Sequence, residues 1–159
     1  TRSTQEGIPR EQLIARYGEA FHEQLKAKFE ALGLVYNPPP EVVPNTRRAL
    51  RLTELARDRG LHEPMHDRLM KAYWEEARNI GDPDELRALA AEVGLDAAEV
   101  EDVLASDAFG DRIERSTREA HSIGVTGVPG FLLDRRLLVL GAHPRPVFEQ
   151  AFARLEQAP

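Results

Sequence analysis

Apolar residues recur at steps of three and four along most of the chain, which is the spacing that places them on one face of a helix. From Arg10 to Leu32 this spacing predicts one long helix whose apolar face includes Tyr17 and Phe21. Further helices with the same spacing should follow it closely. The six predicted helices span residues 10–32, 46–59, 64–77, 83–93, 97–105 and 106–122.

Polar residues and glycines mark the ends of these helices. Asn45, Asp82 and Asp96 stand where an N-cap side chain accepts a backbone N–H. Glu85 and Glu99 each follow an aspartate by three residues, which predicts reciprocal capping boxes. A glycine follows the last apolar position of three helices, at residues 33, 60 and 94. Between the first two helices, the prolines at 38–40 predict an extended surface connector.

The hydrophobic period changes after residue 124. Two short apolar runs, Gly130–Asp134 and Arg136–Leu140, flank an Asp134-Arg135 turn and predict a β-hairpin. The continuous run from Leu137 to Leu140 indicates a strand buried on both faces, so further strands and helices should cover it. A final helix should run from Pro144 to Gln157. Its inward side chains are predicted to be Phe148, Ala151, Phe152 and Leu155.

Composition narrows the classes of function. The 159 residues carry a net charge of −6, and basic and acidic residues are interspersed, so we expect no nucleic-acid partner. No apolar run approaches the roughly 20 residues of a membrane span, and we expect no membrane partner and a cytoplasmic location. The sequence contains no cysteine, which excludes a disulfide, a thiolate metal site and a cysteine nucleophile in this chain.

Four segments together carry a resemblance to a known family: Val43–Thr46, Asn79–Pro83, Gly124–Pro129 and Gly141–Pro144. With the order of helical block, proline loop, hairpin and terminal helix, they resemble the C-terminal two thirds or more of DsbA-family proteins, and the FrnE-like branch in particular. The resemblance implies an α/β fold of the thioredoxin-like DsbA type with a large all-helical insertion. Residues 1–159 would then form one DsbA-like domain, with a helical part at 10–123 and the thioredoxin part at 124–159.

The resemblance also implies a binding site. In the family, the peptide bond before the loop proline is cis, and the backbone there receives an extended peptide or glutathione. It therefore implies a cis bond between Val128 and Pro129 and assigns substrate binding to Gly127, Val128 and Pro129. Protein or peptide thiols and disulfides are the expected partners, with glutathione as a further one. No cofactor or metal is expected.

The sequence departs from the family where its chemistry lies. In the family, a strand, a helix bearing two cysteines separated by two residues, and a second strand come first, and nothing here matches them. Since the chain begins at Thr1 rather than Met, we expect it to be part of a longer protein. The implied activity is thiol–disulfide oxidoreduction, and without cysteines we expect this chain to be inactive as given. No catalytic residue is assigned. Arg135 stands where the family's hairpin turn often has glycine.

Two alternatives stay open. One is a glutathione-dependent isomerase or transferase of the kappa or chromene-carboxylate type, which uses serine in place of cysteine. The other is a non-catalytic binding or assembly module. Without neighbouring strands the hairpin would expose an unpaired edge. This predicts pairing either with a second copy, as a homodimer through that edge, or with a separate N-terminal fragment.

Other residues that could form a metal site or a substrate groove have simpler structural interpretations. His62 and His66 with Glu63 match the zinc-protease pattern, but Pro64 predicts a helix start that separates the two histidines, so no metal site is expected. His143 is expected to be a solvated or capping residue near the hairpin. Four residues at helical spacing could line a substrate groove but are predicted to be core: Leu69, Met70, Tyr73 and Trp74.

Overall fold

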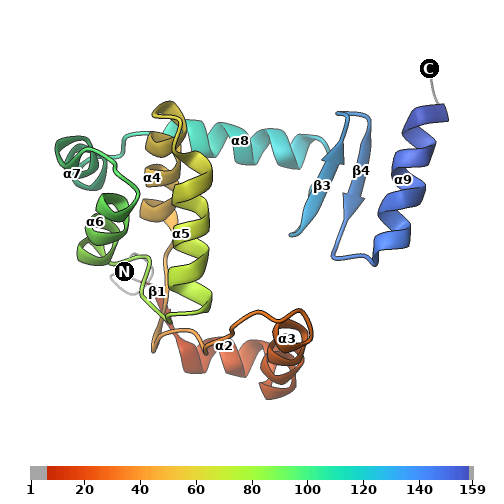
Figure 1. Cartoon of the computed structure of the whole chain (residues 1–159), viewed down its shortest axis with the longest axis horizontal. Coiled ribbons are helices and arrows are strands. Elements are labelled where there is room, and N and C mark those ends of the chain that lie inside the picture. Colours follow the sequence, from red (N-terminus) through yellow and green to blue (C-terminus); the bar gives the residue numbers. More distant parts are fainter. Residues whose placement is uncertain (1–6, 158–159) are drawn as a thin grey trace. The chain divides into compact units, whose positions relative to one another are not determined.

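The computed structural model describes residues 7–157, and the chain divides into two compact units, Thr1–Gly110 and Asp111–Pro159 (Figure 1). Two small antiparallel sheets form, β1 with β2 and β3 with β4. The elements are, in chain order, β1 (Gly7–Pro9), α2 (Arg10–Tyr17), α3 (Glu19–Ala31), β2 (Val42–Pro44), α4 (Arg47–Asp58), α5 (His62–Trp74), α6 (Pro83–Glu92), α7 (Ala97–Ala105), α8 (Gly110–Ser122), β3 (Gly130–Leu133), β4 (Leu137–Leu140) and α9 (Arg145–Gln157).

The first predicted helix is wrong in one respect, because it is broken in two at Gly18. This glycine has φ 81° and ψ 156°, ends α2 and precedes α3. Its amide N–H still donates to the Ile14 carbonyl at 2.7 Å. Only glycine adopts this conformation readily, so the chain turns without strain at a place where the apolar spacing continues.

The predicted N-caps of α6 and α7 are confirmed, but the predicted capping boxes are wrong. Asp82 accepts from the Asp84 N–H at 2.7 Å, and Asp96 accepts from the amides of both Ala98 and Glu99. The glutamates bind arginines instead of returning to the cap backbone. Glu85 accepts from Arg78, and Glu99 accepts from Arg59. A guanidinium offers a carboxylate a stronger, charge-assisted hydrogen bond than a neutral amide does.

Among the predicted helix starts, those of α4 and α8 shift by one and by four residues. Thr46 rather than Asn45 is the N-cap of α4, while the Asn45 side chain accepts from the Arg47 N–H at 2.9 Å. Ser106 does not start the last helix of the block. Its hydroxyl donates to the Asp102 carbonyl and accepts from the Ala108 N–H, so it closes α7, and α8 begins at Gly110.

Helices α4 to α7 enclose the core of the first unit. Four side chains there are almost completely buried, Leu52, Met65, Leu86 and Leu89. They belong to three different helices, so each helix contributes its apolar face to the same cluster. The predicted connector docks onto the end of α5, where the Asn37 N–H donates to the Trp74 carbonyl at 2.7 Å. Pro39 is buried, so the connector is not wholly a surface segment.

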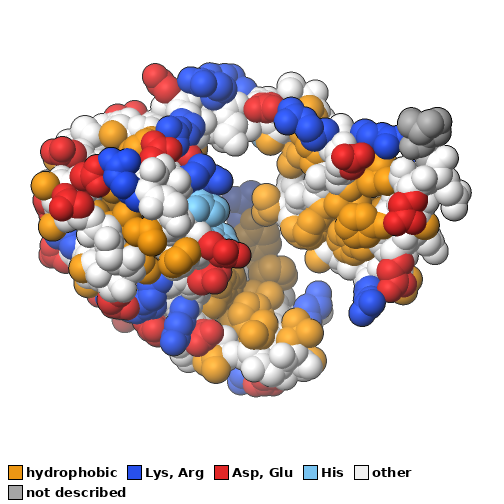
Figure 2. Space-filling view, turned by 45° about the horizontal axis from the view of Figure 1, so that its top comes forward, with side chains coloured by type: hydrophobic (Ala, Val, Ile, Leu, Met, Phe, Trp, Pro, Cys, Tyr) orange, Lys and Arg blue, Asp and Glu red, His pale blue; other side chains and the backbone are white. Residues whose placement is uncertain are grey.

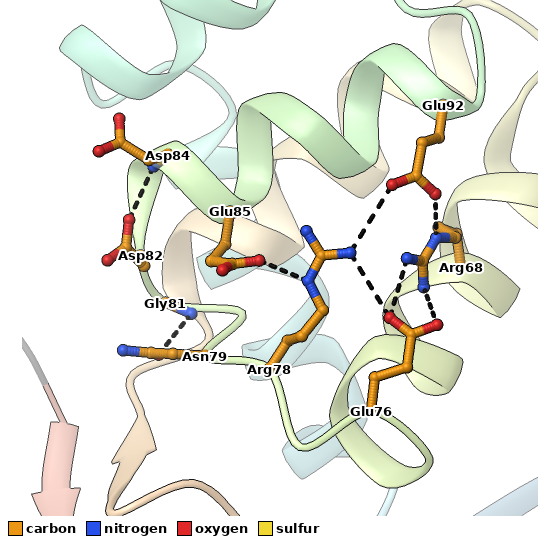
Figure 3. A network of polar contacts seen from close by, with 9 residues as sticks. All are labelled: Arg68, Glu76, Arg78, Asn79, Gly81, Asp82, Asp84, Glu85 and Glu92. Atoms are coloured by element: carbon orange, nitrogen blue, oxygen red, sulfur yellow. Dashed lines mark hydrogen bonds and ion pairs between the residues drawn. The ribbon is translucent and has the colours of Figure 1, made fainter.

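A network of charges joins α5, the segment after it and α6 (Figure 3). Arg68 binds Glu92 through Nε at 2.5 Å and Glu76 through Nη2 at 2.9 Å. Arg78 binds Glu85 at 2.5 Å and lies 3.5 Å from Glu76. The arginine side chains are only 15% and 24% exposed, so these pairs are screened less by solvent than ordinary surface pairs.

We expect acid to destabilise the first unit through this network. Hydrogen bonds from Arg68 hold the pKa of Glu76 and of Glu92 below the ordinary 4.5, against an opposing effect of burial. A lowered pKa in the folded state stabilises it at pH values above 4.5, and this contribution is lost as the pH falls through the lowered value. The stability should therefore decline as the pH falls below 4.5.

Urea unfolding monitored by Trp74 fluorescence measures this decline. Arg68→Gln should cost about 1–2 kcal/mol at pH 7 and reduce the acid dependence. Arg57→Gln is the control, because Arg57 pairs with Glu54 outside the network. If the stability of Arg68→Gln depended on acid pH as the wild type does, the Arg68 pairs would not be the cause of the acid dependence.

The second unit contains α8, the β3–β4 hairpin and α9. The hairpin is confirmed, with Phe131 opposite Val139 in its register. Asp134 and Arg135 have φ 49° and 54°, the positive pair that a type I′ turn requires, and here non-glycine residues adopt it. Phe148 packs edge-on against Phe131, with ring centroids 4.9 Å apart.

Burial of this second unit differs from the prediction. Along β4, Leu137, Leu138 and Val139 are only half-buried and Leu140 is 39% exposed, so the strand is not buried on both faces by the described residues. On α9, Ala151 is buried as predicted, but Phe152 is 53% exposed. The described part of the chain offers no further strand to this sheet, and its apolar residues therefore stay at the surface.

Candidate functional site

The candidate binding loop begins where α8 ends. Gly124, with φ 93°, takes the left-handed conformation and its N–H donates to the His121 carbonyl at 3.0 Å. The Val125 N–H donates to the Ala120 carbonyl, also at 3.0 Å. These two bonds form a Schellman motif, which stops the helix and directs the chain toward β3. The glycine of the sequence motif thus sets where the loop starts.

The three residues assigned to substrate binding lie together at the head of β3. The bond between Val128 and Pro129 is cis, as the family resemblance implies. Val128 is 95% exposed, the highest value among the exposed large hydrophobic residues. A Cβ added at Gly127 would meet no atom within 4 Å. The loop therefore presents its backbone to solvent, with no side chain from residues 7–157 covering Gly127.

Hydrogen-bond alternation shows which backbone groups face the open edge of the hairpin. The Gly141 N–H donates to the Pro129 carbonyl at 2.8 Å, which makes these two residues a hydrogen-bonded pair. In an antiparallel ladder, hydrogen-bonded pairs alternate with pairs that are not hydrogen-bonded. Phe131 and Leu133 therefore also direct their backbone groups toward β4. The backbone groups of Gly130 and Leu132 then point to the outer edge of β3.

Val128, which precedes the cis bond, also has open backbone groups. Its N–H and its carbonyl have no hydrogen-bond partner within the described part of the chain. A second observation is a shallow groove of about 310 Å³ beside the loop. The groove is formed by one face of α8 and by the loop, and it is lined by Ser116, Thr117, Ala120, His121, Val125, Thr126, Gly127 and Val128. The α8 residues of this groove were missed by the sequence analysis, although their spacing places them on one helix face.

Few side chains at this site could take part in acid–base chemistry. The chain has no cysteine, and His121 is the one ionisable side chain that lines the groove. Within residues 7–157, no three histidine, aspartate or glutamate side chains gather as metal ligands. A helix with the length and hydropathy of a membrane span is also absent from residues 7–157.

The two histidines of the protease-like pattern were placed wrongly by the sequence analysis. Both lie on α5, where the rings of His62 and His66 stack with centroids 6.1 Å apart. Pro64 is tolerated because it occupies the first turn, where its missing N–H has no partner to lose. A guanidinium nitrogen of Arg57 lies 2.8 Å from Nε2 of His62, and the described residues provide no third ligand.

The four α5 residues that were predicted to be core rather than groove lining divide between core and surface. Leu69 is buried as predicted, whereas Met70 is 37% exposed. The Trp74 ring packs at a tilt against the rings of Phe29 and Tyr36, with centroids 5.3 and 6.1 Å away. Burial raises the pKa of Tyr73, and the charge of Tyr36 adds to this shift. Met70 and Trp74 also line an apolar groove on α3 and α5.

His143 lies just after β4. Its Nε2 is 2.8 Å from the Leu140 carbonyl, so the ring caps the end of the strand, and the residue remains exposed. This agrees with the expected capping role.

A family model for the DSBA-like thioredoxin domain matches residues 2–153. The chain therefore belongs to the DsbA-like thioredoxin family, and the fold class inferred from the sequence is confirmed. A crystal structure of a probable DsbA oxidoreductase from Streptomyces coelicolor is 38% identical and superimposes with a TM-score of 0.84. That match covers 95% of this chain and 69% of the other.

A curated relative is the uncharacterized protein YwbO of Bacillus subtilis, which is 31% identical over 126 residues. The match covers 78% of this chain and 62% of that protein, so the chain spans less than two thirds of the relative's length.

Proposed function

We propose that this chain supplies the substrate-binding part of a thiol–disulfide oxidoreductase that acts on protein or peptide disulfides. Membership of the DsbA-like family and the likeness to a probable DsbA oxidoreductase support this class of activity. The four motif segments of the sequence support a place in the FrnE-like branch. Gly127, Val128 and Pro129 are the proposed substrate-binding residues.

One observation carries the proposal, namely the open backbone of Val128. An extended peptide can add itself to an exposed strand edge through main-chain hydrogen bonds. The N–H and carbonyl of Val128 offer this peptide a donor and an acceptor on which to pair. A backbone contact of this kind holds a disulfide-bearing segment without requiring one particular side-chain sequence.

The reaction itself needs a thiolate from outside this chain. In thiol–disulfide exchange a thiolate attacks one sulfur of the substrate, a mixed disulfide forms, and the other sulfur leaves as a thiolate. With no cysteine, this chain can orient a substrate but cannot make the attack. The chain as given should therefore reduce insulin in the presence of dithiothreitol no faster than dithiothreitol alone. Turbidity that develops faster with the chain would contradict this part of the proposal.

Binding is tested separately by titrating the ¹⁵N-labelled chain with an extended peptide that contains S-methylcysteine. We expect the amide signals of Gly127, Val128 and Gly130 to shift. N-methylation of the peptide residue that donates to the Val128 carbonyl should weaken binding about fivefold, the effect of one lost hydrogen bond. N-methylation of the adjacent residue, whose N–H points away, is the matched control. Shifts confined to other parts of the chain would contradict the assignment of the loop.

Glutathione is a shorter extended peptide and is tested on the same loop. Under the glutathione-dependent alternative, it should shift the same amides more strongly than the protein-like peptide does. The assembly alternative rests on the exposed apolar surface of the hairpin and α9, and it is tested by self-association.

A further inference from the structure

A cavity in the first unit lies between α2, α3 and the connector that leads to β2. Its volume is about 630 Å³, which is within the range of small-molecule sites, and it shares no residue with the proposed binding loop. The connector lines it with residues 36–39. Four side chains of α3 at the spacing of one helix face form another wall, namely Glu19, His22, Glu23 and Lys26.

Hydrogen bonds hold the connector wall in place. Arg10 of α2 donates from Nη1 to the Pro39 carbonyl at 2.8 Å, and its backbone N–H donates to the Glu41 carbonyl at 2.8 Å. At the other end of the wall, the Asn37 side chain donates to the Glu75 carbonyl. The cavity is therefore formed before any ligand enters, which lowers the entropic cost of binding.

The lining presents charges of both signs. Glu19 and Glu23 form no ion pair within residues 7–157. Lys26 is paired loosely with Glu30, because the two atoms are 3.9 Å apart and both side chains are more than half exposed. The Arg10 guanidinium binds only a neutral carbonyl among the described residues. Two carboxylates and two cationic groups are thus available to a ligand.

Tyr36 adds a neutral hydroxyl group to this lining. Its ring packs edge-on against Phe29, with centroids 5.3 Å apart, and its Oη lies 3.4 Å from Nδ1 of His22. Burial raises the pKa of Tyr36, and the charge of Glu23 adds to this shift. The phenol therefore keeps its proton near neutral pH and can donate a hydrogen bond.

We propose that this cavity binds a small zwitterion with an apolar body, either an apolar amino acid or a short peptide with free ends. The ammonium group binds Glu19 and Glu23, and the carboxylate binds Arg10 and Lys26. Ile14 and the connector prolines contact the apolar body. A ligand with a single charge would meet a like charge in the same cavity, and an uncharged ligand would desolvate charged groups without pairing them.

The test uses the whole chain with the dipeptide leucyl-phenylalanine, followed through the ¹⁵N signals of His22, Glu23 and Asn37. Acetylation of the dipeptide removes its ammonium group, and amidation removes its carboxylate. Each change should weaken binding about tenfold. Glu23→Gln should weaken binding of the free dipeptide and reduce the loss that acetylation causes, while the loss that amidation causes remains. Glu11→Gln is the matched control, because Glu11 is exposed on α2 and does not line the cavity.

Lys26→Gln makes the opposite change and should reduce the loss that amidation causes. This selective pattern, with wild-type affinities in Glu11→Gln, is the expected result. Equal affinities for the free and blocked dipeptides, equal effects of Glu23→Gln and Glu11→Gln, or shifts confined to residues 127–130 would overturn the proposal. Phenylalanine distinguishes the two sources, since an amino-acid site should bind it at least as tightly as the dipeptide and a peptide site should bind it more weakly.

Discussion

Replacing Leu52 with alanine should lower the free energy of unfolding of the first unit by about 3 kcal/mol. Leu52 is 0% exposed and lies in the cluster that α4 shares with α5, α6 and α7. Truncation removes the transfer free energy of the lost methyl groups and leaves a cavity that close-packed neighbours fill only in part. A loss of this size is a large part of the stability of a typical domain.

Leu50→Ala is the matched control for this prediction. Leu50 lies two residues away on the same helix and is 48% exposed. The same chemical change there should cost less than about 0.5 kcal/mol, because little apolar surface is lost and alanine is a good helix former. Urea unfolding monitored by Trp74, the single tryptophan, reports on this unit. Similar losses in the two variants would show that Leu52 is not central to the core.

Sequence patterns whose partners lie within a few residues, such as helix caps and turns, predicted the local structure well. Asp82 and Asp96 each satisfy amides two or three residues further on, so their caps depend on nothing outside the helix start. The hairpin turn at Asp134 and Arg135 is equally local. The candidate loop was found for the same reason, since a short motif marks it.

Partners distant in sequence explain the errors. Glu99 satisfies the capping-box pattern, yet Arg59 lies 40 residues away in sequence and binds its carboxylate. The contacts of Arg51 with Ser106 and Asp107 were not predicted either, because more than 50 residues separate them in sequence. The break at Gly18 was missed because glycine within a helix costs only about 1 kcal/mol, so a single glycine does not reveal a turn. Leu137–Leu140 were predicted to be buried from an apolar run alone, which cannot show whether the covering strands belong to the same chain.

The exposed apolar surface of the hairpin leads to a further prediction, that the chain self-associates through the outer edge of β3. Leu132 and Phe152 are 44% and 53% exposed, and Figure 2 shows hydrophobic side chains gathered over the hairpin and α9. Gly130 and Leu132 direct their backbone groups to an edge with no paired strand in the described part of the chain. Unpaired edges of this kind template pairing with another chain, and natural proteins protect them with charged residues such as lysine.

We therefore propose a homodimer in which the two β3 edges pair, and Leu132→Lys should raise its dissociation constant at least about tenfold. The lysine adds charge at the edge and leaves the turn and the β3–β4 ladder unchanged. Leu32→Lys makes the same substitution at a site that is 74% exposed in the first unit and should leave association unchanged. Sedimentation velocity between about 1 and 100 μM brackets the dissociation constants of weak dimers. A wild-type chain that stays monomeric over this range would contradict pairing through β3, because the open edge would then bind no second copy. Equal effects of the two lysines would also contradict it, because the loss of association would not depend on the position of the new charge.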